Sequence, residues 1–84
     1  MLNVYAATWC PHCEDTVTYL KEHGIAFNYI DIEKSPEAVV KKVVEVNGGD
    51  DWVVPTLEYN GQWREGKIFE AEELEKDLRK LGVI

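Results

Sequence analysis

The sequence has few cysteines and basic residues, and it contains no long hydrophobic run. Its only cysteines, Cys10 and Cys13, enclose so short a loop that a disulfide between them would restrict the unfolded chain very little. No apolar run approaches the roughly 18 residues of a membrane-spanning helix. The N-terminus also lacks the pattern of a secretory signal. We therefore expect neither a membrane span nor a structural disulfide, and we predict a cytoplasmic protein.

Basic side chains are outnumbered by acidic ones. The chain has 9 Lys and Arg against 16 Asp and Glu, which gives a formal net charge of −7. An acidic surface repels phosphate backbones and anionic lipids, so we expect neither nucleic acid nor membranes as partners. The 84 residues, of which 45% are hydrophobic, suit a single domain over 1–84. We expect that domain to be a monomer.

The first part of the chain has the pattern of a β-α-β unit. Residues 2–6 form an apolar run typical of a buried strand. Pro11 suits the first position of a helix with Cys10 as its N-cap, and Gly24 is a stop signal for that helix. Residues 25–32 are rich in β-forming side chains and predict a second strand. A helix between two strands predicts parallel pairing with a right-handed crossover.

The second part of the chain predicts a helix, a hairpin and a last helix. Valines recur after Ser35-Pro36 and stop at Asn47, which favours a helix although a strand is the competing interpretation. Asn60-Gly61 between two β-rich runs, 53–59 and 62–65, indicates a hairpin. Leucines spaced by four and three residues predict an amphipathic C-terminal helix. The order β-α-β-α-β-β-α predicts an α/β three-layer sandwich with a mixed four-stranded sheet.

The motif Cys10-Pro11-His12-Cys13 follows the first strand and opens the first helix. Two thiols at this spacing can cycle between dithiol and disulfide. Unpaired N–H groups at a helix N-terminus favour the thiolate, which is the attacking species in thiol-disulfide exchange, so Cys10 is the candidate nucleophile. Cys13 lies one turn deeper and is expected to be more buried. A protonated His12 would further favour the thiolate and make the disulfide more oxidising, although His12 could also be an exposed spacer.

A metal site is the main alternative for this motif. Zinc usually takes four ligands, and only His12 and His23 are available besides the cysteines, neither at the usual spacing. We therefore expect no bound metal. Two interpretations stay open beside redox exchange, namely an inert pair of thiols and a metal or iron-sulfur cluster shared between two chains through Cys10.

The run from Thr8 to Cys13, the later Val54-Pro55-Thr56 and the order of elements together resemble the glutaredoxin-like branch of the thioredoxin superfamily. The resemblance implies that Cys10 is the nucleophile and Cys13 the resolving cysteine. It also implies a cis Val54-Pro55 bond facing the cysteines, with the Val54 backbone pairing to the substrate. Thr8 and Trp9 beside Cys10 are expected to contribute to substrate binding.

Two departures from the family pattern concern glutathione. Many glutaredoxins have a lysine three residues before the first cysteine, where this chain has Ala7. They also have a Gly-Gly and an acidic pair after the last strand, and here only Gly66 corresponds to that substrate-binding segment. Trp9 before Cys10 is similar to thioredoxins and mycoredoxins, so the electron donor stays open.

The sequence thus predicts a glutaredoxin-like thiol-disulfide oxidoreductase that reduces protein or low-molecular-weight mixed disulfides. It is expected to hold no tightly bound cofactor and to use glutathione or another low-molecular-weight thiol as co-substrate. One alternative is a thioredoxin-type electron carrier served by a thioredoxin reductase. A dimeric iron-sulfur or metal-binding module is the alternative from another class.

Overall fold

The computed structural model describes all 84 residues. Its elements follow the predicted order, with one added 3₁₀ turn, η1, between β2 and α2. Their bounds are β1 Leu2–Ala6, α1 Pro11–Glu22, β2 Phe27–Asp31, η1 Ile32–Lys34, α2 Glu37–Val46, β3 Thr56–Tyr59, β4 Gln62–Arg64 and α3 Ala71–Leu81. None of the helices is long and apolar enough to cross a membrane.

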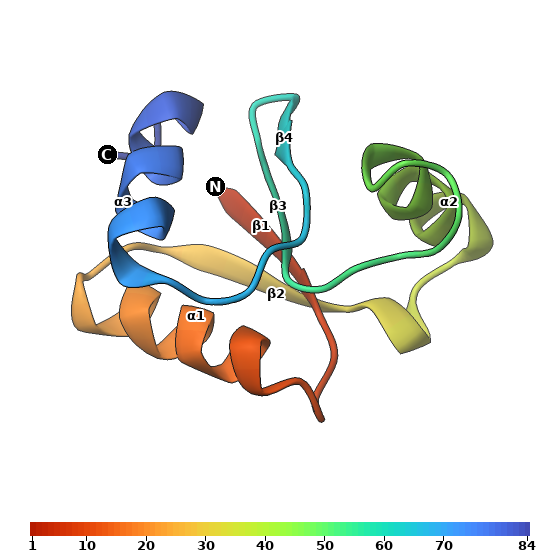
Figure 1. Cartoon of the computed structure of the whole chain (residues 1–84), viewed down its shortest axis with the longest axis horizontal. Helices are drawn as coiled ribbons and strands as arrows, with labels where there is room; N and C mark the ends of the chain where they lie inside the picture. The colour runs from red at the N-terminus through yellow and green to blue at the C-terminus, as the bar shows by residue number, and fades with distance from the viewer.

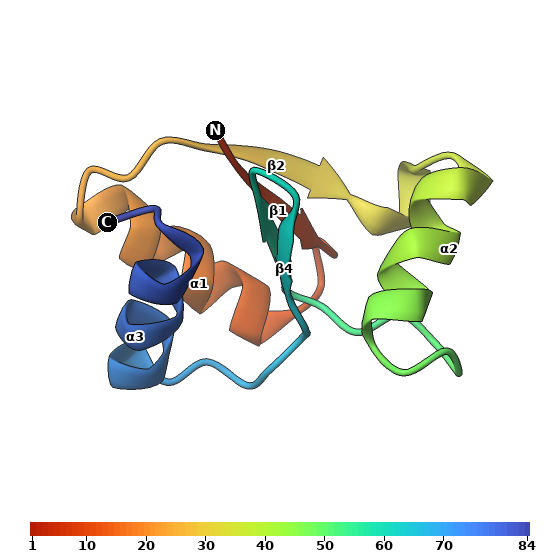
Figure 2. The ribbon, with the colours of Figure 1, turned by 90° about the horizontal axis from the view of Figure 1, so that it is seen from above.

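The four strands form one mixed sheet in the order β2-β1-β3-β4. Strand β1 pairs in parallel with β2 and antiparallel with β3, and β3 pairs antiparallel with β4. Helices α1 and α3 cover one face of this sheet, and α2 covers the other (Figures 1 and 2). The predicted three-layer sandwich is therefore confirmed, and the inner strand β1 leads through residues 7–10 into α1.

Local signals at both ends of α1 explain its bounds. Cys10 has extended backbone angles, φ −87° and ψ 116°, and its sulfur accepts a hydrogen bond from the Cys13 backbone N–H. Pro11 follows at the first helical position, where its missing N–H costs nothing. At the other end Gly24 has a φ of +66°, which an L side chain rarely adopts. The strand-to-helix junction thus places Cys10 at the N-cap, as predicted.

Two details differ from the sequence prediction. Strand β2 begins at Phe27, because the Ile25 N–H donates to the Leu20 carbonyl and completes the end of α1. Strand β3 begins at Thr56, because Pro55 has no N–H for sheet pairing. The valine-rich segment is the helix α2, as predicted, and among its valines only Val43 is buried.

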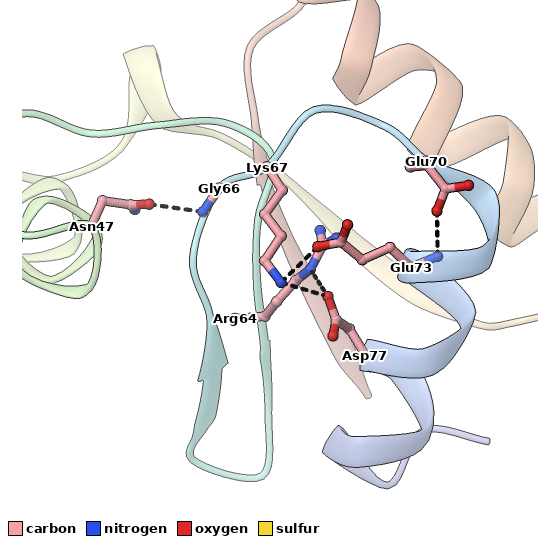
Figure 3. Close-up of polar contacts among 7 residues, drawn as sticks. All are labelled: Asn47, Arg64, Gly66, Lys67, Glu70, Glu73 and Asp77. Carbon is pink, nitrogen blue, oxygen red and sulfur yellow. Dashed lines mark hydrogen bonds and ion pairs between the residues drawn. The ribbon is translucent and has the colours of Figure 1, made fainter.

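A cluster of charged side chains ties β4 to α3 (Figure 3). Arg64 Nε donates to Asp77 Oδ2 at 2.8 Å, and both side chains are buried. Lys67 Nζ lies 3.0 Å from the same oxygen and 3.0 Å from Glu73 Oε1. Burial alone would raise the pKa of Asp77, but hydrogen bonds from Lys67 and Arg64 outweigh it and hold this pKa below its ordinary value. The cluster ties the first half of α3 to the end of β4 and to Lys67.

Candidate active site

The Cys10 side chain lies between the start of α1 and the loop before β3. Its sulfur accepts the Cys13 N–H at 3.2 Å and lies 3.9 Å from the Val54 carbonyl oxygen. The turn that carries it is closed by a hydrogen bond from the Cys10 N–H to the Ala7 carbonyl at 3.1 Å. Only 6% of Cys10 is exposed, so the site is a recessed sulfur at a helix N-terminus.

The Cys13 thiol is still more enclosed, with 1% of the residue exposed. Burial, followed by the hydrogen bond with the Cys10 sulfur, raises the pKa of Cys13 to about 12. Both cysteines are free thiols in this structure. Cys13 is therefore a protonated thiol at neutral pH, and the role of Cys10 as the nucleophile stays a prediction.

We expect iodoacetamide at pH 7 to alkylate Cys10 and leave Cys13 unmodified. The reagent reacts with thiolates, and Cys13 with a pKa of about 12 supplies almost none at this pH. Peptide mass spectrometry of the quenched protein measures the two labels, with protein in denaturant as the control in which both react. Equal labelling of the two cysteines in the folded protein would contradict the assigned order.

The Val54-Pro55 peptide bond is cis, which confirms the expectation from the resemblance. Pro55 is buried, whereas Val54 is partly exposed and directs its carbonyl toward Cys10. Residues 53–55 pair with no other strand. Their backbone thus forms an edge beside Cys10 to which an extended peptide could pair.

Trp9, the residue before Cys10, forms an aromatic pair with Trp52. Trp9 is 63% exposed, and its indole N–H donates to Glu33 Oε1 at 2.8 Å. The Trp9 and Trp52 rings lie 6.3 Å apart between centroids. Thr8 is exposed next to Trp9 and lines a shallow hollow together with Cys10. Thr8 and Trp9 thus lie beside Cys10, and their contribution to substrate binding stays a prediction.

Gly66 lies in the segment between β4 and α3, against the loop that carries Val54. A Cβ at position 66 would collide with Val53, lying 2.9 Å from its carbonyl carbon. The Gly66 N–H donates to Asn47 Oδ1 at 2.7 Å (Figure 3). Asn47 Nδ2 in turn donates to Thr56 Oγ1 at 3.0 Å. Gly66 is thus required for close packing beside the site, and its contact with a substrate stays a prediction.

His12 accepts a hydrogen bond that the sequence does not predict. Its Nδ1 accepts the Phe69 backbone N–H at 3.1 Å. His12 is half-buried, so it is not a freely exposed spacer. His23 lies at the other end of α1, where its Nδ1 contacts the Tyr19 carbonyl oxygen at 2.9 Å. The influence of His12 on the cysteines stays a prediction.

Sequence reasoning missed three residues that shape the site: Glu33, Asn47 and Phe69. Glu33 anchors the Trp9 indole, Asn47 accepts the Gly66 N–H, and Phe69 donates its backbone N–H to His12. Asn47 carries a local signal as the C-cap of α2, but that signal predicts a helix end and not a tertiary bridge. No group of three or more His, Cys, Asp and Glu side chains is arranged to hold a metal ion.

The fold and the site together define a class. A Cys-x-x-Cys pair at the start of α1, beside a proline loop on a mixed four-stranded sheet, is the arrangement of the thioredoxin-like dithiol proteins. Within that class, the Glutaredoxin family model matches residues 2–63. The chain belongs to the glutaredoxin family.

Individual relatives agree with this assignment. The glutaredoxin-like protein NrdH of Lactococcus lactis subsp. cremoris is 44% identical over 46 residues, which are 55% of this chain and 62% of that protein. A putative glutaredoxin of Mycobacterium tuberculosis is 36% identical over 58 residues, covering 69% of this chain and 67% of that protein. The crystal structure of a glutaredoxin from Archaeoglobus fulgidus superimposes with a TM-score of 0.73 at 28% identity, covering 93% of this chain and 85% of that one.

Proposed function

We propose that the protein is a thiol-disulfide oxidoreductase that reduces protein or low-molecular-weight mixed disulfides by dithiol exchange. The observation that carries the proposal is the unequal state of the two sulfurs. Cys10 lies at the N-cap of α1, where it receives the Cys13 N–H, whereas Cys13 is buried with a pKa of about 12. Membership of the glutaredoxin family supports the same chemistry.

The exchange runs in two displacements. The Cys10 thiolate attacks one sulfur of the substrate disulfide, forms an S–S bond to it and releases the other sulfur as a thiolate. Cys13 then loses its proton and attacks the Cys10 sulfur, which forms the Cys10–Cys13 disulfide and releases the second thiolate. The dithiol loses two electrons and two protons, and the substrate disulfide gains them as two thiols. An external thiol or a reductase must then return two electrons to the protein.

The environment of Cys13 orders these two steps. Besides burial, its high pKa comes from the hydrogen bond and the charge interaction with the Cys10 sulfur. Both interactions weaken once Cys10 is bound in a mixed disulfide, because that sulfur no longer carries a negative charge. The first displacement therefore lowers the pKa of Cys13 at the stage when a second nucleophile is needed, while burial, the largest cause of its raised pKa, persists.

Two observations favour a reductase over glutathione as the electron donor. Many glutaredoxins have a lysine at the position of Ala7, and alanine supplies no cation for a glutathione carboxylate. Ala7 is also buried, with 2% of the residue exposed. Lys67, the cation that follows Gly66, is held by Asp77 and Glu73. A glutathione carboxylate would have to compete with these two side chains for Lys67. This favours the alternative of a carrier reduced by a thioredoxin reductase.

We expect thioredoxin reductase with NADPH to reduce the oxidised protein with a higher kcat/KM than glutathione does. A coupled assay that follows NADPH consumption, with glutathione reductase present in the glutathione arm, compares the two donors directly. A Cys10→Ser variant gives the background rate in both arms. A higher kcat/KM with glutathione would reverse the choice of donor, and no reduction of a disulfide substrate by the dithiol form itself would overturn the proposed function.

A further inference from the structure

Two side-chain acceptors hold the segment 65–70, which connects β4 to α3 and has no regular secondary structure. Asn47 Oδ1 accepts the Gly66 N–H at 2.7 Å. His12 Nδ1 accepts the Phe69 N–H at 3.1 Å. Asn47 belongs to the end of α2 and His12 to the start of α1, so the segment is fastened to both helical layers.

The second of these bonds determines where His12 carries its proton. A backbone N–H can only donate, so the His12 nitrogen that faces it must be an unprotonated acceptor. The imidazole that makes this contact is neutral, with its proton on Nε2. A ring protonated on both nitrogens has no lone pair with which to accept the Phe69 N–H. The motif leads us to expect a cationic His12. A cationic ring cannot accept the hydrogen bond from Phe69 that the structure contains.

The segment held by His12 is adjacent to the edge that faces the nucleophile. Gly66 packs so closely on Val53 that no Cβ would fit between them. Val54 follows Val53, and its carbonyl oxygen lies 3.9 Å from the Cys10 sulfur. If the segment shifted at Phe69, Gly66 would move against Val53. That movement would displace the edge of residues 53–55 that lies beside Cys10.

We propose that His12 is a positioning residue that acts as a neutral acceptor. Through the Phe69 N–H it fixes segment 65–70 against the Val53–Pro55 edge, and it is not the cation that stabilises the Cys10 thiolate. This assignment rests on the dithiol exchange proposed above. It places the contribution of His12 in the binding of the disulfide substrate.

Fixing the segment in advance lowers the cost of binding. Ile68 is 72% exposed and lies between the two fastened positions, Gly66 and Phe69. A segment ordered before the substrate arrives does not have to lose its conformational freedom during binding. Without the hydrogen bond from the Phe69 N–H to His12, the segment would lose its conformational freedom during substrate binding, which would weaken binding. The expected result is a higher KM for a protein disulfide with little change in kcat.

Two replacements of His12 separate the acceptor from the charge. His12→Asn keeps an oxygen close to the position of Nδ1 but cannot become a cation, whereas His12→Ala removes both functions. We expect His12→Ala to raise KM for a protein disulfide substrate about fivefold, the effect of one lost hydrogen bond, and His12→Asn to restore a KM near that of the wild type. His23→Ala, at the far end of α1, is the matched control and is expected to leave KM unchanged.

Three further readouts do not depend on turnover. We expect the ¹⁵N shifts of His12 in the reduced protein at pH 7 to show a proton on Nε2 alone. The Phe69 amide should exchange slowly in the wild type and His12→Asn, and faster in His12→Ala. The reduction potential of His12→Asn should equal that of the wild type. A doubly protonated His12, or a potential that shifts equally in both variants, would overturn the proposal. A wild type that fails to exchange disulfides while keeping these NMR signatures would refute the proposed function but not the neutral acceptor.

Discussion

Replacing Cys10 with serine is expected to abolish disulfide reduction, whereas replacing Cys13 with serine is expected to stop the reaction at a mixed disulfide on Cys10. The Cys10 sulfur is the one at the helix N-terminus beside the Val54 edge, and a hydroxyl there cannot attack a disulfide. Loss of such a nucleophile lowers turnover by at least about 10³-fold. Cys13→Ser keeps the nucleophile but removes the buried thiol that would resolve the intermediate.

Intact-mass spectrometry under non-reducing conditions distinguishes these outcomes. Incubated with a protein disulfide, Cys13→Ser should gain the mass of the substrate, and the adduct should be lost on treatment with dithiothreitol. Cys10→Ser is the matched control and should gain nothing. Retained activity in Cys10→Ser, or an adduct on Cys13 in that variant, would reverse the roles of the two cysteines.

Asp77→Asn is expected to destabilise the fold by about 3 kcal/mol at pH 7, because it removes the charge that compensates a buried arginine. Asp77 accepts hydrogen bonds from Arg64 at 2.8 Å and Lys67 at 3.0 Å. Glu75→Gln on the same helix is the control. Glu75 pairs with Arg79 at 3.0 Å on the exposed surface, and such pairs contribute less than about 1 kcal/mol. Urea unfolding followed by circular dichroism measures both variants.

The penalty for Asp77→Asn should depend on pH in a defined direction. The pKa of Asp77 is lower in the folded protein than in the unfolded chain, so its contribution is complete above the ordinary value of about 4 and is lost as the pH falls through the lowered value. The difference between wild type and variant should therefore shrink below pH 4. A difference that stays constant from pH 7 to pH 2 would show that packing, not charge, is responsible.

Local signals in the sequence were sufficient for most of the architecture. Pro11 and Gly24 delimit α1, Asn60-Gly61 marks the hairpin, and the leucines of α3 identify its buried face. These signals work because each acts within a few residues of its own position. The position of Cys10 at the N-cap followed from the same local patterns, and only its partner at Val54 required the family resemblance.

The contacts that complete the site join positions far apart in the chain. Trp9 and Glu33 are separated by 24 residues, and His12 and Phe69 by 57. Neither Glu33 nor Phe69 carries a local pattern that names its partner, because the pairing arises only when α1, η1 and the segment before α3 meet. The same holds for Gly66, whose missing Cβ is needed only because Val53 packs against it.

The charged cluster of Arg64, Lys67, Glu73 and Asp77 also has a consequence for the behaviour of the protein on heating. The cost of removing charged groups from water falls as temperature rises, while hydrophobic stabilisation per unit area reaches a plateau. Lys67 and Asp77 lie 3.0 Å apart at the junction between β4 and α3. The ion pairs at this junction thus contribute a larger share of the free energy of unfolding as the temperature rises. The destabilisation caused by Asp77→Asn should therefore grow relative to that of a core apolar truncation when both are compared at higher temperature.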